Sequence, residues 1–336
     1  METTNKYLNK KVLITGGGGF IGSNLATKLV GLGAKVRIMD SQLKGHGFNR
    51  FNLAHLQDKI ELDFADIRNV ESVERNITGQ EIIFNLAAQV GEKNSLIDPA
   101  LDKAINIGGH CNVLETVLRY NPSARIIFTG SRLQYGKIEC NLPVSEDEPL
   151  NPITPYAKNK AEGERIYLAM HKEKGLQTTA VRITNPYGPG ASISNPGYCI
   201  TNWFIGKAIE GSNLPIYGKG DQLRDYLYID DLVDALLLVG IDKQAVGQIF
   251  NIGSGIGTPF NYMAEKIVEL TEGTKSKIKF VDWPEDAKDR ETGDFVANIT
   301  RIRQCLGWSP KYSLEEGLRK TIDFYKLNKQ HYFQTI

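Results

Sequence analysis

Short apolar runs along the chain alternate with longer segments in which apolar residues recur at helical spacing. Such alternation predicts repeated strand–helix–strand units around a parallel sheet. Several of the runs are apolar throughout, as strands covered by helices on both faces are. We therefore expect an α/β protein built on a doubly wound parallel Rossmann sheet. Its strands are expected within residues 11–16, 35–40, 59–66, 81–88, 124–130 and 178–185.

The pattern changes after residue 185. Residues 185–198 are rich in Pro, Gly, Ser and Asn, which indicates an irregular connection instead of another strand and helix. Strand-like stretches at 225–239 and 248–255 then suggest a return to the sheet, and helices are expected near 260–271 and 314–326. We expect an NAD-binding Rossmann domain and a smaller, discontinuous α/β substrate domain. The first covers 1–185 and about 224–256, and the second covers 186–223 and 257–330.

Composition favours a folded protein whose partners are small molecules. Of 336 residues, 41% are hydrophobic and 24% charged, which is ordinary globular usage. The 40 Lys and Arg against 39 Asp and Glu give a formal charge of +1, and no long basic run occurs, so neither nucleic acid nor an anionic membrane is an expected partner. The four cysteines are widely spaced, as unpaired thiols in a reducing cytoplasm are.

Targeting and metal signals are absent from the sequence. The first ten residues are polar, so we expect no signal peptide, and the longest apolar run, 235–241, is too short to span a bilayer. A cytoplasmic location is therefore expected. The five histidines show no HExxH or clustered spacing, so no metal site is expected.

Residues 15–22 read TGGGGFIG and join a predicted strand to a predicted helix. The first turn of such a helix has free N–H groups and a dipole that favour a phosphate, provided that no Cβ blocks its approach. Gly17, Gly19 and Gly22 satisfy the pattern GxGxxG, whereas Gly16, Gly19 and Gly22 satisfy GxxGxxG. The spacing does not choose between these two registers.

Asp40 ends the next predicted strand, 18 residues after Gly22. A carboxylate there can accept hydrogen bonds from the adenosine ribose hydroxyls and would repel a 2′-phosphate, so NAD is favoured over NADP. The alternative is an aspartate that opens a turn. Asp66 and Ile67, after the third predicted strand, are expected near the adenine.

Tyr156 and Lys160 lie four residues apart on a predicted helix that Thr154 caps and Pro155 begins. An ordinary tyrosine has a pKa of about 10, but a nearby ammonium favours its phenolate. Such a pair alone also fits an amphipathic helix with an exposed lysine. Ser131 follows a predicted strand, at the sheet edge where ligands bind in open α/β proteins, which favours a catalytic group.

An ordered set of motifs across nearly the whole chain resembles the extended short-chain dehydrogenase/reductase family, specifically its nucleotide-sugar epimerases and dehydratases. The resemblance implies the GxxGxxG register and the catalytic group Ser131, Tyr156 and Lys160. The motifs are TGGGGFIG, NLAAQ (85–89), INIGG (105–109), TGSRLQYG (129–136), YAKNK (156–160), RITNPYGP (182–189), YGKGDQLRDYLYIDDL (217–232) and LGWSPKYSLEEGL (306–318).

The resemblance also implies two sets of binding residues. A nucleoside-diphosphate sugar is the implied substrate, held by Gln89, Arg132, Asn185, Arg224 and Arg290, the last preferred over Lys288. Arginine suits a diphosphate because its donors form a planar fork, although Arg224 could instead pair with Asp225. The implied NAD site comprises Gly16, Gly19, Phe20, Ile21, Gly22, Asp40, Asp66, Ile67, Leu86, Ala87, Ala88, Gln89, Asn106, Tyr156 and Lys160.

The two positions that follow Ser131 distinguish branches of the resembled family. Its 4,6-dehydratases carry a sequence similar to Thr-Asp-Glu where this chain has Ser131, Arg132 and Leu133. Its 3,5-epimerases and related reductases carry a cysteine where this chain has Leu133. Both are disfavoured here. The segments FNLAAQV and SLIDP are similar to a branch containing CDP-sugar 2-epimerases, and Arg132 and Gln134 are unusual for 4-epimerases, so the carbon that is inverted stays open.

The expected function is therefore an NAD-dependent nucleotide-sugar epimerase, 4-epimerase-like or of the CDP-sugar 2-epimerase type. One alternative is a dehydratase or decarboxylase on the same scaffold, and another is a non-catalytic NAD-binding sensor. The resemblance also implies a homodimer formed through helices near 103–119 and 156–173.

Overall fold

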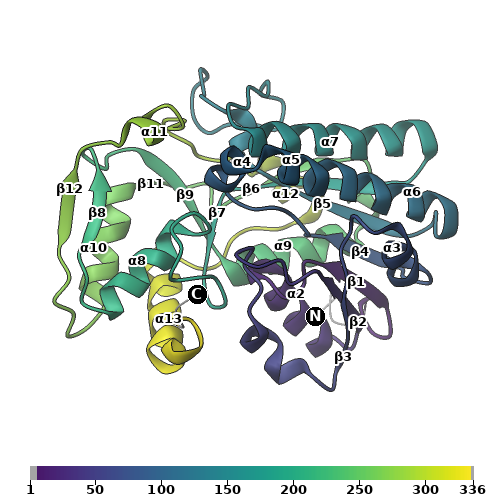
Figure 1. The fold of residues 1–336 in the computed structure, drawn as a ribbon. Coiled ribbons are helices and arrows are strands. Elements are labelled where there is room, and N and C mark those ends of the chain that lie inside the picture. Colours follow the sequence, from purple (N-terminus) through teal and green to yellow (C-terminus); the bar gives the residue numbers. More distant parts are fainter. Residues whose placement is uncertain (1–5, 334–336) are drawn as a thin grey trace.

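The computed structural model describes residues 6–333, and the first five residues of the polar N-terminal segment lie outside this range. Seven parallel strands form the central sheet in the order β10-β6-β5-β4-β1-β2-β3, which confirms the predicted doubly wound α/β fold (Figure 1). Its strands are β1 (Lys11–Thr15), β2 (Lys35–Asp40), β3 (Ile60–Phe64), β4 (Ile82–Asn85), β5 (Arg125–Ser131), β6 (Gln177–Ile183) and β10 (Ile249–Ile252).

Helices cover both faces of this sheet because its strands are apolar on both sides. Within β1, Val12 and Ile14 pack into one core cluster, while Leu13 between them belongs to the other. The first face carries α2 (Phe20–Gly31) and α9 (Ile229–Ile241). The second face carries α3 (Val70–Ile77), α6 (His110–Tyr120) and α7 (Pro155–Lys174).

A smaller part of the molecule lies beside the carboxyl ends of the sheet strands (Figure 1). It contains a three-stranded sheet, a two-stranded sheet and three helices that pack on one another, α8 (Ile200–Ile209), α10 (Phe260–Leu270) and α13 (Leu314–Asn328). Its strands are β7 (Asn185–Tyr187), β8 (Leu214–Tyr217), β9 (Leu223–Tyr228), β11 (Gly257–Pro259) and β12 (Ile278–Val281), and the short helix α11 (Glu285–Lys288) follows β12. Helix α12 (Thr300–Leu306) packs instead on β10 of the central sheet.

The predicted strand-like stretch 225–239 is wrong in two respects. Only its beginning is a strand, β9, and this strand pairs with β7 and β11 in the smaller sheet. The remainder forms α9, which is buried almost all round against the central sheet. A helix buried on every side is apolar throughout and therefore lacks the periodicity that separates helix from strand. The predicted domain boundaries stay a prediction.

The connection between β4 and β5 is also more complex than one helix. It contains α4 (Glu92–Ile97), α5 (Pro99–Lys103), a π-helical segment (Ala104–Gly109) and α6, and the last three form one continuous rod. Such π-helical turns often mark functional sites. Short 3₁₀ turns occur at Arg50–Leu56, Arg132–Tyr135, Lys243–Ala245 and Lys329–His331.

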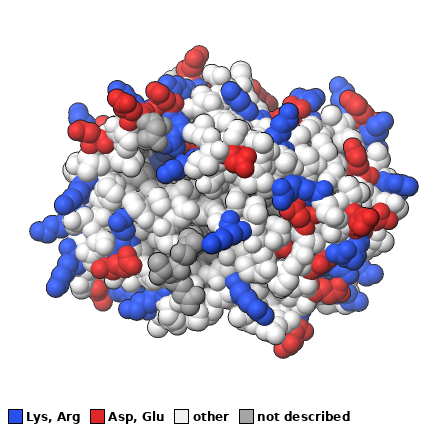
Figure 2. Space-filling view, in the orientation of Figure 1, with Lys and Arg blue, Asp and Glu red and all other residues white. Residues whose placement is uncertain are grey.

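The surface carries both signs of charge. On the face in Figure 2, basic and acidic side chains are interspersed, most of them towards the periphery. None of the helices within residues 6–333 combines the length and apolar character needed to cross a membrane. All four cysteines are described and none forms a disulfide. No cluster of His, Cys, Asp or Glu in the described part of the chain could hold a metal ion.

Candidate active site

A cavity of about 420 Å³ opens at the carboxyl ends of the strands, where the strand order reverses between β1 and β4. This is the position and size expected for a small-molecule site in a doubly wound sheet. Sixteen of the predicted site residues line it. They are Gly16, Gly19, Phe20, Ile21, Gly22, Asp40, Asp66, Ile67, Leu86, Ala87, Ala88, Ser131, Arg132, Tyr156, Lys160 and Asn185.

The glycine turn joins β1 to α2 and forms the floor of the cavity. A Cβ on Gly16 would lie 2.9 Å from backbone atoms of Ala87, and one on Gly22 would lie 2.6 Å from the carbonyl oxygen of Gly16. Gly19 has no such neighbour and faces the cavity, whereas Gly17 packs on Ile38 outside its lining. The geometry therefore favours the GxxGxxG register.

The start of α2 is suited to an anion. Its N-cap is Gly19, and no side chain caps the free N–H groups of its first turn. These groups consequently remain available at the floor of the cavity, together with the positive end of the helix dipole. A cradle without Cβ atoms beneath such a helix end fits the pyrophosphate of a dinucleotide.

Asp40 lies at the end of β2 on the same side of the cavity. Its Oδ2 accepts a hydrogen bond from the Gly18 amide at 2.9 Å, and its Oδ1 accepts one from the Gln42 amide at 2.9 Å. Burial raises the pKa of this carboxyl, although both amides oppose the shift. Asp66 accepts hydrogen bonds from Arg68, 2.7 Å from the guanidinium, at the neighbouring strand end. The two amides thus fix the Asp40 carboxylate at the lining of the cavity, and its contact with a ribose stays a prediction.

Tyr156 and Lys160 are placed by the first turns of α7. Thr154 accepts a hydrogen bond from the Ala157 amide and caps this helix, as predicted. Lys160 is 2% exposed, and its ammonium donates to the carbonyl oxygen of Thr129 at 3.0 Å and lies 5.9 Å from the centroid of the Tyr156 ring. Tyrosine and lysine therefore share one wall of the cavity.

The electrostatic environment of Tyr156 differs from the sequence-based expectation. Burial raises its pKa, the carboxylates of Asp102 and Glu92 raise it further, and the Ser131 hydroxyl lowers it. Burial also lowers the pKa of Lys160 to about 8, against the opposing effect of Asp102. The expectation that Lys160 would depress the tyrosine pKa is not met in the protein alone, because desolvation of the phenolate dominates.

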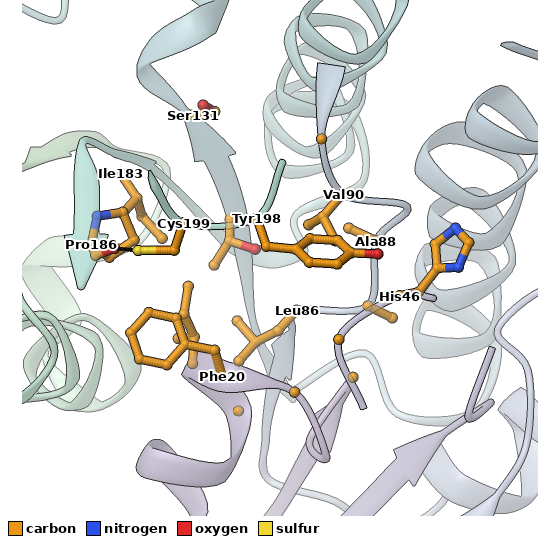
Figure 3. A pocket seen from close by; sticks show the side chains of 18 of the residues that line it. Phe20, His46, Leu86, Ala88, Val90, Ser131, Ile183, Pro186, Tyr198 and Cys199 are labelled. Atoms are coloured by element: carbon orange, nitrogen blue, oxygen red, sulfur yellow. Dashed lines mark hydrogen bonds between the residues drawn. The ribbon is translucent and has the colours of Figure 1, made fainter. Parts of the chain in front are cut away.

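Ser131 ends β5 and begins a 3₁₀ turn that a buried network holds rigid. Its amide donates to Gln134 Oε1 at 2.7 Å, and Gln134 Nε2 donates to Glu164 at 3.0 Å. Glu164 in turn pairs with Arg182 at 2.6 Å, and both side chains are 4% exposed. This network leaves the Ser131 hydroxyl at the cavity while fixing its backbone (Figure 3).

Two predicted cofactor residues lie behind the cavity wall. Asn106 donates to the carbonyl oxygen of Gln89 and to Asp102, each at 3.1 Å. The Gln89 amide, oriented to satisfy its neighbours, donates to Asp102 at 2.6 Å and accepts from Ser95. The Asn106 Oδ1 is buried and has no partner in the described part of the chain. In the structure the side-chain amides of Asn106 and Gln89 stabilise the cavity wall. Their contact with NAD stays a prediction.

Two predicted substrate arginines also lie outside the cavity lining. Arg224 donates to the carbonyl oxygens of Leu223 and Gly293 and forms an ion pair with Glu291. The alternative partner, Asp225, instead accepts hydrogen bonds from backbone amides, so the neighbouring ion pair does not form. Arg290 precedes Glu291 in the same segment.

Phe48, Tyr198 and Glu92 are among the lining residues that the sequence-based set missed. Phe48 packs on Gly18, where a Cβ would meet its ring. Tyr198 extends across the cavity towards Val90 and Ala88 (Figure 3). Glu92 lines the wall after β4. Only Glu92 carried a usable signal, since it is a charged residue that closely follows the carboxyl end of an apolar strand.

Comparisons with known proteins show the family to which the chain belongs. Residues 12–253 match the sequence model of the NAD dependent epimerase/dehydratase family. The chain is 32% identical to a UDP-glucose 4-epimerase of Mycolicibacterium smegmatis, over 95% of this chain and 100% of that protein. It is 31% identical to a CDP-paratose 2-epimerase of Salmonella typhi, over 94% and 98%.

The fold comparison points the same way. The UDP-glucose 4-epimerase of Thermotoga maritima, solved with UDP-glucose, superposes with a TM-score of 0.87 at 30% identity, over 95% of this chain and 99% of that one. A UDP-glucuronic acid decarboxylase and a dTDP-glucose 4,6-dehydratase are also similar. The cofactor of the present protein is NAD. The chain belongs to the NAD dependent epimerase/dehydratase family, whose members act on nucleotide sugars.

Proposed function

We propose that the protein is an NAD-dependent nucleotide-sugar epimerase, which inverts one sugar carbon through a transient keto sugar. The observation that carries the proposal is that Ser131, Tyr156 and Lys160 line one cavity. The glycine turn, Arg132 and Asn185 line the same cavity. Relatives whose names state inversion at carbon 4 and at carbon 2 support an epimerase without selecting the carbon.

The cofactor would occupy the side of the cavity nearest the amino-terminal strands. Gly16, Gly19 and Gly22 would admit the pyrophosphate to the first turn of α2, and Asp40 would accept the ribose hydroxyls. Bound NAD supplies a hydride acceptor that can return the hydride to the same carbon. The remaining chemistry is proton transfer and positioning by side chains of this chain.

Tyr156 would act as the general base. Its phenolate oxygen takes the proton from the reacting hydroxyl. It returns the proton after the keto sugar has rotated to present its other face to the cofactor. Ser131 donates a hydrogen bond to the oxygen on which charge develops. The Lys160 Nζ lies 5.9 Å from the centroid of the tyrosine ring, where an ammonium would favour the phenolate against the desolvation that burial imposes.

The substrate would occupy the opposite side of the cavity. Asn185 lines it with an Oδ1 that is buried and has no partner among residues 6–333, so a ligand donor would satisfy this oxygen. Arg132 lines the same side. Arg224 would bind the diphosphate only by exchanging Glu291 for it, which arginine can do because both anions match its planar fork. Arg290 is proposed alongside it.

The second candidate function is loss of water or carbon dioxide from a nucleotide sugar. Glu92 favours this candidate because it places a carboxyl group within electrostatic reach of Tyr156. The positions after Ser131 oppose it, since Arg132 and Leu133 cannot serve as an acid and base pair. A non-catalytic NAD sensor is disfavoured because it would not need the tyrosine, lysine and serine at one cavity.

The test is turnover of a defined panel. Purified protein with NAD is incubated with UDP-, GDP-, CDP- and dTDP-hexoses, and each reaction is followed by proton NMR. We expect one nucleotide series to give two epimers at equilibrium. A product of lower mass would support the second candidate, and no conversion of any sugar together with retained NAD would support the sensor.

A further inference from the structure

Glu92 has no role in the mechanism described above, yet it lies inside the candidate active site. It is the first residue of α4 and follows the loop that leaves β4 at the switch point of the sheet. Its side chain lines the same cavity as Ser131 and Tyr156. The loop and helix therefore place a carboxylate at the wall that the sugar would face.

One oxygen of this carboxylate has no partner. Oε1 of Glu92 is shielded from solvent and accepts no hydrogen bond in the described part of the chain. Burial raises the pKa of the group, against favourable interactions with Arg132, the Thr154 hydroxyl and Arg290. A buried acceptor without a donor is unfavourable, so its presence at a cavity wall indicates a donor supplied by a ligand.

Two arginines that are proposed to bind the nucleotide sugar also act on Glu92. Arg132, which lines the same cavity, and Arg290 both act to lower its pKa. The carboxylate in turn raises the pKa of Tyr156, so Glu92 lies within electrostatic reach of the proposed catalytic base. Glu92 is therefore assigned to the part of the cavity that would hold the sugar.

We propose that Glu92 accepts a hydrogen bond from a ring hydroxyl of the substrate sugar and makes the site selective for sugars that carry a donor at that position. This inference rests on the proposed function and names its substrate class more narrowly: hexoses that keep this hydroxyl, in preference to their deoxy analogues. Sites built to bind a hydroxyl reject analogues that lack it strongly, because the buried acceptor is then left unpaired.

The test compares the binding of each nucleotide with that of its sugar ester. The NAD-loaded protein carries Tyr156→Phe to prevent turnover. Calorimetry measures its affinity for four pairs of ligands: UDP and UDP-glucose, GDP and GDP-glucose, CDP and CDP-glucose, and dTDP and dTDP-glucose. In the pair that binds, we expect Glu92→Leu to weaken the sugar ester by about tenfold or more and the free nucleotide by less than about twofold. Glu92→Gln keeps one acceptor oxygen, so its effect should be smaller.

Two controls separate this role from a structural one. Glu272→Leu changes an exposed glutamate in the loop after α10, outside the cavity lining, and should leave both affinities unchanged. The unfolding temperature of Glu92→Leu should stay close to that of the parent, because the burial of the carboxylate opposes its favourable interactions with Arg132, the Thr154 hydroxyl and Arg290. A clear fall in the unfolding temperature would overturn the inference.

The binding outcomes distinguish the inference from the function it rests on. Equal weakening of nucleotide and sugar ester, or no weakening of either, would overturn the role of Glu92 and leave the epimerase proposal standing. Failure of all four pairs to bind would overturn both. A deoxy analogue of the bound glucose ester whose affinity is low and is unaffected by Glu92→Leu would identify the hydroxyl and support the inference.

Discussion

Tyr156 is the residue on which the proposed chemistry depends. Tyr156→Phe keeps the ring and its packing but removes the oxygen that accepts the proton. We expect kcat to fall by about a hundredfold or more, with little change in the unfolding temperature. Tyr217→Phe, on β8 and 40% exposed, is the matched control and should keep full activity. Steady-state turnover of the panel substrate checks both, and near-parental turnover of Tyr156→Phe would remove the tyrosine from the mechanism.

Asp102 is buried behind the catalytic pair and sets its pH range. Its carboxylate raises the pKa of Tyr156 by disfavouring the phenolate, and raises the pKa of Lys160 by favouring the ammonium. Asp102→Asn should therefore shift both limbs of the kcat/KM profile to lower pH, as measured over the stable range of the enzyme. Asp58→Asn, at an exposed position, should leave the profile unchanged. A shift of the profile to higher pH would contradict the assigned sign.

At the scale of the elements, the turn between β1 and α2 depends on the absence of side chains. Gly22→Ala would drive a Cβ to within 2.6 Å of the Gly16 carbonyl oxygen and the Gly17 Cα, so the turn must shift. We expect a stability loss of about 1–3 kcal/mol and a clear loss of NAD affinity. Gly31→Ala lies in the same helix with open space around it and should hold or raise stability. Urea unfolding and NAD titration compare the two, and equal behaviour would contradict the cradle.

The helices and strands also show which parts of the fold the hydrophobic pattern of the sequence can predict. The six predicted runs all form strands of the central sheet, because short apolar segments bounded by turn residues have few other uses. Helix α9 was mistaken for a strand since its burial on all sides removes the helical period. The hydrogen bonds of Gln89 and Asn106 in the cavity wall could not be predicted, because a motif position does not reveal the partner with which a side-chain amide forms a hydrogen bond. The partner of Arg224, 67 residues away in Glu291, likewise depends on tertiary packing.

At the scale of the whole molecule, ligand binding should stabilise the fold selectively. NAD binds the folded chain and not the unfolded chain. NAD at about 100 times its Kd should therefore add roughly 2.7 kcal/mol to the free energy of unfolding. NADP should add much less, because the Asp40 carboxylate would repel its 2′-phosphate. Thermal unfolding of protein freed of nucleotide, with either ligand, measures the difference. Equal stabilisation by NADP would contradict the role of Asp40.

The most direct measurement of the central claim is the isotopic outcome of turnover in deuterium oxide. If Tyr156 removes only the hydroxyl proton and the carbon-bound hydrogen returns from the cofactor, the product epimer should have the mass of its substrate and no deuterium on carbon. Mass spectrometry and proton NMR of the product read both properties at once. Deuterium at the inverted carbon, or loss of water or carbon dioxide, would contradict epimerisation by this route.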